Sequence, residues 1–213
     1  MLLRRSTDNS RNAFALLALG ALLLAGCASG PGSTGSARGG MRIERQDVPS
    51  KAYTQYEKAV ASMAAGDSID AELRFQEFLL AYPDYAGAYI NLAIIFAGRG
   101  DDIAAGASLA DALVLDPEHP VALNQLGMLR RRQGRFPEAE SAYMKAVTAS
   151  PDYALAHYNL GVLNDLYLQR LDAALQHYER YQEIAGEDKL VSKWIVDLTR
   201  RIGNAERTAN VTE

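Results

Sequence analysis

The chain has 213 residues, of which 48% are hydrophobic and 23% are charged, enough for one ordinary domain. Its formal net charge is −4, and residues 27–213 carry −6 because the first 26 residues are basic, which argues against nucleic-acid binding as the main function. One cysteine excludes an internal disulfide or a cysteine-rich zinc site, and three histidines leave little material for a histidine metal cluster.

Residues 1–26 have the form of a secretory signal peptide. Three arginines precede an apolar and small-residue run from Ala13 to Ala25, which is shorter than the roughly 20 residues of a spanning helix. The run ends in Leu24-Ala25-Gly26-Cys27, which resembles the lipobox of bacterial lipoproteins. The resemblance implies cleavage before Cys27, a diacylglycerol on its thiol and an acyl group on its new amino terminus. An uncleaved anchor and an ordinary secretory signal with an incidental cysteine remain the alternatives.

The residue after the cysteine indicates in which membrane the lipoprotein is expected to be anchored. Inner-membrane lipoproteins often carry Asp there, whereas this chain has Ala28, so the resemblance implies the periplasmic face of the outer membrane. Residues 27–50 are rich in glycine and serine and predict a flexible tether with a root-mean-square span of about 25–30 Å. The folded body is therefore expected to stand clear of the lipid surface.

A 34-residue period governs residues 51–187. Pro83, Pro117 and Pro151 are 34 apart, as are Gly66, Gly100 and Gly134, with columns of small and of large apolar residues between them. Each unit predicts two amphipathic helices, the first ended by glycine and the second by proline.

This pattern resembles the tetratricopeptide repeat, whose helix pairs stack into a right-handed superhelix. The resemblance implies an all-α, right-handed α-solenoid of about four pairs, at about 52–85, 86–119, 120–153 and 154–187. In unit four one residue is inserted around Tyr167-Leu168-Gln169. Residues 188–203 predict a capping helix on which Trp194 covers the last exposed core, and residues 204–213 predict a flexible tail.

No catalytic pattern is present in the sequence. His157 and His177 lie on the two predicted helices of unit four and are expected to approach each other, but a pair without a third ligand is usually structural. Carboxylates at predicted turns and helix starts are expected to be helix caps or solvated charges. We therefore expect no enzyme activity, no metal, no small-molecule substrate and no cofactor other than the covalent lipid on Cys27.

A protein-binding groove is the favoured site. In tetratricopeptide proteins the first helix of each pair lines the concave face, which receives a peptide or helix of a partner protein. Carried onto this sequence, the groove comprises Tyr53, Tyr56, Ile90, Asn91, Ile94, Asn124, Gln125, Met128, Arg131, Tyr158, Asn159 and Val162. Asn91, Gln125 and Asn159 recur every 34 residues and either bind a partner backbone or tie helices together. Tyr56 and Val60 occupy positions that lysine or asparagine would need for a carboxylate clamp, so that mode is not expected.

Arg130, Arg131, Arg132 and Arg135 form the one dense basic cluster. The interpretations are a solvated face, an ion pair with Asp165 and an acidic partner segment. Taken together, the sequence predicts a lipid-anchored periplasmic adaptor or assembly factor. Pilotins, which help pilus secretins assemble in the outer membrane, are the leading specific case, and an adaptor for peptidoglycan hydrolases or envelope proteases is the alternative.

Overall fold

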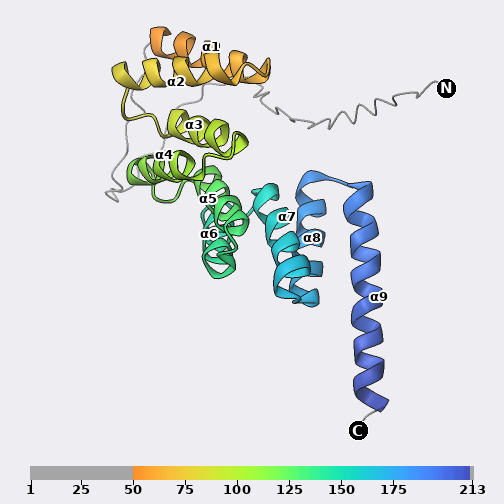
Figure 1. Ribbon diagram of the computed structural model, residues 1–213. Coiled ribbons are helices and arrows are strands. Elements are labelled where there is room, and N and C mark those ends of the chain that lie inside the picture. Colours follow the sequence, from red (N-terminus) through yellow and green to blue (C-terminus); the bar gives the residue numbers. More distant parts are fainter. Residues whose placement is uncertain (1–49, 212–213) are drawn as a thin grey trace, which may run out of the picture.

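The computed structural model describes residues 50–211, and the predicted signal peptide, Cys27 and most of the linker lie outside them. These residues form an α-solenoid of four helix pairs followed by one long helix, with no strand in the described range (Figure 1). The first helices of the pairs are α1 (Ser50–Ala64), α3 (Ala86–Gly98), α5 (Pro120–Arg132) and α7 (Ala154–Leu163). The second helices are α2 (Ser68–Ala81), α4 (Asp102–Leu115), α6 (Phe136–Ala149) and α8 (Leu171–Ala185). The last helix is α9 (Lys189–Val211). Within residues 50–211, no helix combines the length and apolarity needed to cross a membrane.

The periodic glycines end the first helices as expected. Gly66, Gly100 and Gly134 adopt φ values of +80°, +80° and +73°, which residues with a side chain rarely take. In the first unit the N–H of Gly66 donates to Met63 O and that of Asp67 donates to Ser62 O, and the other two turns repeat this pair of bonds. This is the Schellman motif, which satisfies the last carbonyls of the helix and reverses the chain.

The core is a series of small clusters rather than one central mass. Each cluster joins helices that are neighbours along the array, such as Ala59 and Phe75 of unit one with Leu92 of unit two. In the second cluster Ala93 and Leu109 meet Leu129 of the next unit. No pair buries its apolar face alone, which is why several stacked units are needed for stability.

In each of the last two units, a tyrosine ring of the second helix occupies the position that a side chain on a glycine of the first helix would need. A Cβ added to Gly127 would lie 2.4 Å from the ring of Tyr143, and one added to Gly161 would lie 2.5 Å from the ring of Tyr178. Both tyrosines are almost fully buried. The predicted small-residue column therefore exists because a large ring of the second helix packs against the backbone of the first.

The inserted residue of unit four forms a π-helical turn. Residues Asn164–Leu168 (η1) continue α7 with wider hydrogen bonding, and Gln169 takes the left-handed conformation that glycine takes in the other units, with φ 53°. The N–H of Arg170 donates to Asn164 O, one residue further back than in the other turns. The insertion is absorbed before α8 begins, so α7 and α8 still pair.

The last helix is longer than predicted. It begins at Lys189, where Asp188 Oδ1 accepts the N–H groups of Leu190 and Val191, and it continues through Gly203 to Val211. The predicted flexible tail from residue 204 is therefore wrong for residues 204–211. An isolated glycine lowers helix stability by only about 1 kcal/mol relative to alanine and does not by itself end a helix. Trp194 packs against Tyr158 and Tyr178, as expected for a residue that closes the array.

Candidate protein-binding groove

The first helices form the inner side of the curve. Helix α5 approaches both α3 and α7 directly, whereas α2, α4 and α6 make no comparable contacts with one another in the described part of the chain. Helices that are close together lie on the concave side of a curved array. The predicted assignment of α1, α3, α5 and α7 to the concave face is consistent with this arrangement.

A hollow of about 290 Å³ lies on the first helix of unit three. Its lining includes Gln125, Met128 and Arg131 of α5 and Ala93 and Ala97 of α3. Three predicted groove residues are thus brought to one place. Met128 is 38% exposed, so its flexible thioether is available for apolar contact.

Arg131 differs from the arginines beside it. Arg130 donates to Gln133 Oε1, and Arg132 donates to Ala97 O and forms an ion pair with Asp102. Arg131 has no ion pair among the described residues, and its guanidinium lies 6.0 Å from the ring centre of Tyr167. A guanidinium above an aromatic face gains a modest cation–π attraction and keeps its hydrogen-bond donors for a ligand.

Asp165 does not pair with the arginine cluster. Its Oδ1 accepts from Arg201 of α9 at 2.8 Å, and its carboxylate is mostly buried. The predicted ion pair between Asp165 and the cluster is therefore wrong, because the π-helical turn directs Asp165 toward the last helix. The basic charge of Arg131 is left facing the groove.

Tyr167 was missed as a groove residue. The π-helical turn carries this side chain to the edge of the hollow, where its ring packs on Phe136 with centroids 4.8 Å apart. It is 45% exposed. The insertion around residues 167–169 was the only sequence signal, and such turns are often found at functional sites.

Three of the predicted groove residues are in the core instead. Ile90, Asn124 and Asn159 are between 1% and 5% exposed, so no partner can reach them without unfolding the array. Asn159 Nδ2 donates to Asn124 Oδ1 at 2.9 Å and joins unit four to unit three. For this pair the amides tie helices together, because a buried amide must find its partner inside the protein.

Of the predicted groove tyrosines, Tyr53 is exposed, whereas Tyr56 and Tyr158 are half-buried and pack against neighbouring helices. Tyr53 is 62% exposed at the first helix. Tyr56 accepts a hydrogen bond from Asn91 Nδ2 at 2.8 Å, and burial raises the pKa of its hydroxyl. Tyr158 packs on Tyr181 and Trp194, and burial also raises its pKa. Ile94 and Val162 are half-buried. Among the predicted residues, Gln125, Met128 and Arg131 form the compact accessible site.

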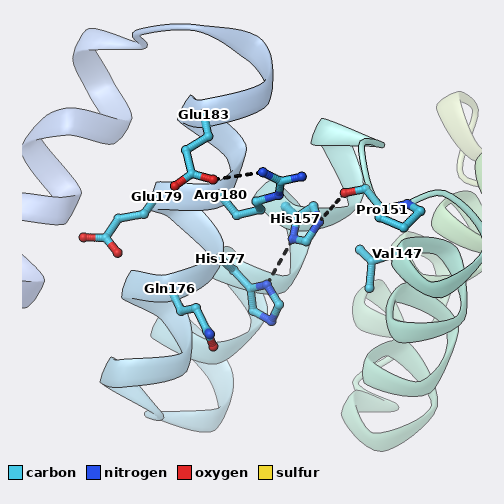
Figure 2. A pocket seen from close by; sticks show the side chains of 8 residues that line it. All are labelled: Val147, Pro151, His157, Gln176, His177, Glu179, Arg180 and Glu183. Carbon is cyan, nitrogen blue, oxygen red and sulfur yellow. Dashed lines mark hydrogen bonds and ion pairs between the residues drawn. The ribbon is translucent and has the colours of Figure 1, made fainter.

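The two histidines of unit four approach each other as expected (Figure 2). Their Nδ1 atoms are 3.2 Å apart, and His157 Nε2 lies 3.1 Å from Pro151 O. Because a carbonyl only accepts, His157 donates from Nε2 and its Nδ1 accepts the proton of His177 Nδ1. Burial, followed by the charge of His157, lowers the pKa of His177 to about 4.

The histidine pair borders a cavity of about 440 Å³ on the outer side of unit four, with Arg180 and Glu183 also lining it. Arg180 forms ion pairs with Asp152 and Glu183. Among the described residues no three histidine, cysteine or acidic side chains are placed to hold a metal ion. The pair is best explained as a structural link. His157 of α7 contacts Pro151 in the preceding turn through one ring nitrogen and His177 of α8 through the other.

Comparison with known proteins agrees with the fold. Two profiles described as tetratricopeptide repeat match residues 56–120 and 118–187. Among curated proteins, no sequence relative matches the chain.

Among solved structures, PilF of Pseudomonas aeruginosa superposes with a TM-score of 0.66 at 20% identity. That match covers 73% of this chain and 70% of the other. MamA from Desulfovibrio magneticus gives a TM-score of 0.61 at 18% identity, covering 76% and 92%. The first repeat domain of RPAP3 (Spaghetti), solved with an HSP90 peptide, gives 0.52 at 21% identity, covering 55% and 95%. At such identities these matches show the fold alone.

Proposed function

This chain belongs to the tetratricopeptide repeat family, and from that premise we propose that it is a lipid-anchored periplasmic adaptor that holds a segment of a partner protein in its concave groove. Repeats of this family mediate protein–protein interaction, and a family member has been solved with a bound peptide. The observation that carries the proposal is the hollow on α5, where Arg131 has no ion pair in the described part of the chain and stands beside Met128 and Tyr167.

The chemistry of the hollow specifies the kind of segment that it takes. Met128 and the ring of Tyr167 offer apolar contact, Gln125 offers a donor and an acceptor, and Arg131 offers a fork of donors to a carboxylate. A partner segment that inserts an apolar side chain next to an acidic one satisfies all three. Desolvating Arg131 without such an acidic partner would weaken binding.

The location is proposed from the sequence. The Leu24-Ala25-Gly26-Cys27 motif supports lipid attachment at Cys27, and Ala28 supports the outer membrane over the inner. A pilus secretin is the leading specific partner, supported by the superposition on the pilF protein over 73% of the chain.

The groove is tested by comparing two neighbouring arginines. Arg131→Ala removes the groove-facing charge, whereas Arg130→Ala removes the same charge from a side chain that contacts Gln133 and lies outside the hollow. With a partner captured by crosslinking from residue 128, we expect Arg131→Ala to weaken binding about tenfold or more, as for the loss of a charged hydrogen bond. Arg130→Ala should leave affinity unchanged. Equal effects of the two variants would contradict the groove.

The anchor and the partner class are tested separately. Cys27→Ala should abolish incorporation of labelled palmitate and shift the protein from the membrane to the soluble fraction. A deletion strain should contain secretin subunits that are monomeric or mislocalised. Normal secretin multimers would exclude the pilotin role while leaving the groove and the anchor intact.

A further inference from the structure

On the outer side of the array, exposed aliphatic residues gather on the second helices of the first two units, α2 and α4. On α2, Ile69, Leu73 and Leu80 are 67%, 60% and 88% exposed, and on α4, Ile103 and Val114 are 87% and 80% exposed. Their spacing places each set on one face of its helix. We call these five residues the convex stripe.

The fold itself does not require apolar residues at these positions. The positions of α8 equivalent to Ile69, Leu73 and Leu80, after allowing for the inserted residue, are Asp172, Gln176 and Glu183. Unit four therefore packs normally with polar side chains where units one and two have Ile, Leu or Val. Apolar residues that gather on one exposed face of a helix are candidates for an interaction surface.

The surroundings of the stripe are strongly acidic. Residues 51–119 contain four Lys or Arg against eleven Asp or Glu, a net charge of −7. Glu77 and Asp111 are exposed and precede Leu80 and Val114 by three residues, which places them beside the stripe. An anionic lipid surface would be repelled, so the charge favours an apolar partner with basic flanks.

The last helix, α9, has an outer face that combines apolar and basic side chains. The outward face of α9 presents Lys189, Lys193, Val196, Arg200 and Arg207 at helical spacing, and all five are exposed. Its opposite face is buried through Val191 and Leu198. The stems of lysine and arginine cover apolar surface while their charged ends reach outward.

The two surfaces cannot meet within one molecule. Helices α2 and α9 lie at opposite ends of the array, with α3 to α8 between them (Figure 1). A contact between them therefore joins two copies. It is heterologous, so a pair of copies keeps one free convex stripe and one free α9 face and can recruit another copy at either end.

We propose that the convex stripe binds the basic outer face of α9 from a second copy of this chain, producing head-to-tail association. Apolar stems cover the stripe, and lysine and arginine ends pair with Glu77 and Asp111. Exposed ion pairs are weak and are screened by salt, so the association is reversible and depends on salt. The proposal needs neither the groove nor the lipid anchor.

Sedimentation velocity on the chain from residue 28 onward, which contains every described residue, tests the proposal. At low salt we expect the mean mass to rise with concentration beyond a dimer, and high salt should return it to the monomer. Glu77→Lys with Asp111→Lys makes the stripe basic, and Lys189→Glu with Lys193→Glu makes α9 acidic. Each double variant alone should be monomeric, because like charges then face each other.

Mixing the two double variants provides the decisive measurement. Opposite charges again face each other at the contact, so association should return. Lys145→Glu is the matched control, because Lys145 is the position of α6 equivalent to Glu77. It should associate like the natural protein. A natural chain that stays monomeric at every concentration, or a mixture that does not recover, would overturn the proposal, as would binding of a monomer to phospholipid vesicles through Leu80.

Discussion

Replacing Gly127 by alanine tests whether the glycine–tyrosine contact sets the packing of unit three. The new Cβ would lie 2.4, 2.5 and 2.9 Å from three ring carbons of Tyr143, distances that packed side chains do not reach. Tyr143 is fully buried, so its ring has no open space to enter. Overpacking of this kind costs about 1–3 kcal/mol. Removing glycine from a helix interior returns about 0.5–1 kcal/mol.

The expected net result for Gly127→Ala is a free energy of unfolding lowered by up to about 2.5 kcal/mol, measured by urea unfolding followed by circular dichroism. Gly106→Ala in α4 is the matched control. Its Cβ would meet Leu129 at an ordinary 3.6 Å, so it should instead stabilise by about 0.5–1 kcal/mol. Stabilisation by both substitutions would refute the packing argument.

A compensating change sharpens the test. Unit two already combines Ala93 with Leu109 at the positions that hold Gly127 and Tyr143 in unit three. Gly127→Ala with Tyr143→Leu reproduces that combination and should recover most of the lost stability, because the smaller side chain leaves room for the methyl group. Failure to recover would mean that the ring is not what the glycine accommodates.

The remaining predictions concern buried polar groups. Asn159→Ala leaves Asn124 Oδ1 without its donor and should lower stability by about 1–3 kcal/mol, whereas Asn91→Ala, at a half-buried amide, should cost less; the order is checked by urea unfolding. Tyr143→Phe removes a buried hydroxyl that has no hydrogen-bond partner among residues 50–211, so stability should stay equal or rise, and a clear loss would contradict this. Because the folded pKa of His177 lies near 4, below its unfolded value, the unfolded chain binds more protons between about pH 4 and 6.5, and stability should fall as pH falls through that window. His177→Gln should flatten this dependence in thermal melts, and an unchanged slope would assign it to other groups.

The repeat frame was predictable because its markers are local. A glycine at positive φ and a residue before proline act through the backbone, so Gly66, Gly100, Gly134 and the prolines fix the turns wherever they occur. The inserted residue near Tyr167 was visible for the same reason, as a break in the period. Family profiles over residues 56–187 confirm the frame.

How deeply each side chain is buried was not predictable from the sequence in the same way. A period assigns Asn124 and Asn159 to the inner face, but the close approach of α5 to α7 decides that they are buried against each other. The sequence also shows an insertion without showing where it points. Only the π-helical geometry turns Tyr167 toward Arg131 and Asp165 toward Arg201.

The π-helical turn has a consequence for how arrays of this kind diversify in evolution. Extra length placed inside a packed helix would displace every later contact, but here it is taken up where α7 ends, and α8 keeps its register with Tyr178 against Gly161. One added codon at that junction thus supplies a new aromatic side chain to the inner wall while the hairpin stays intact. Junctions after the first helix are therefore where related arrays should acquire new binding preferences at the least risk to folding.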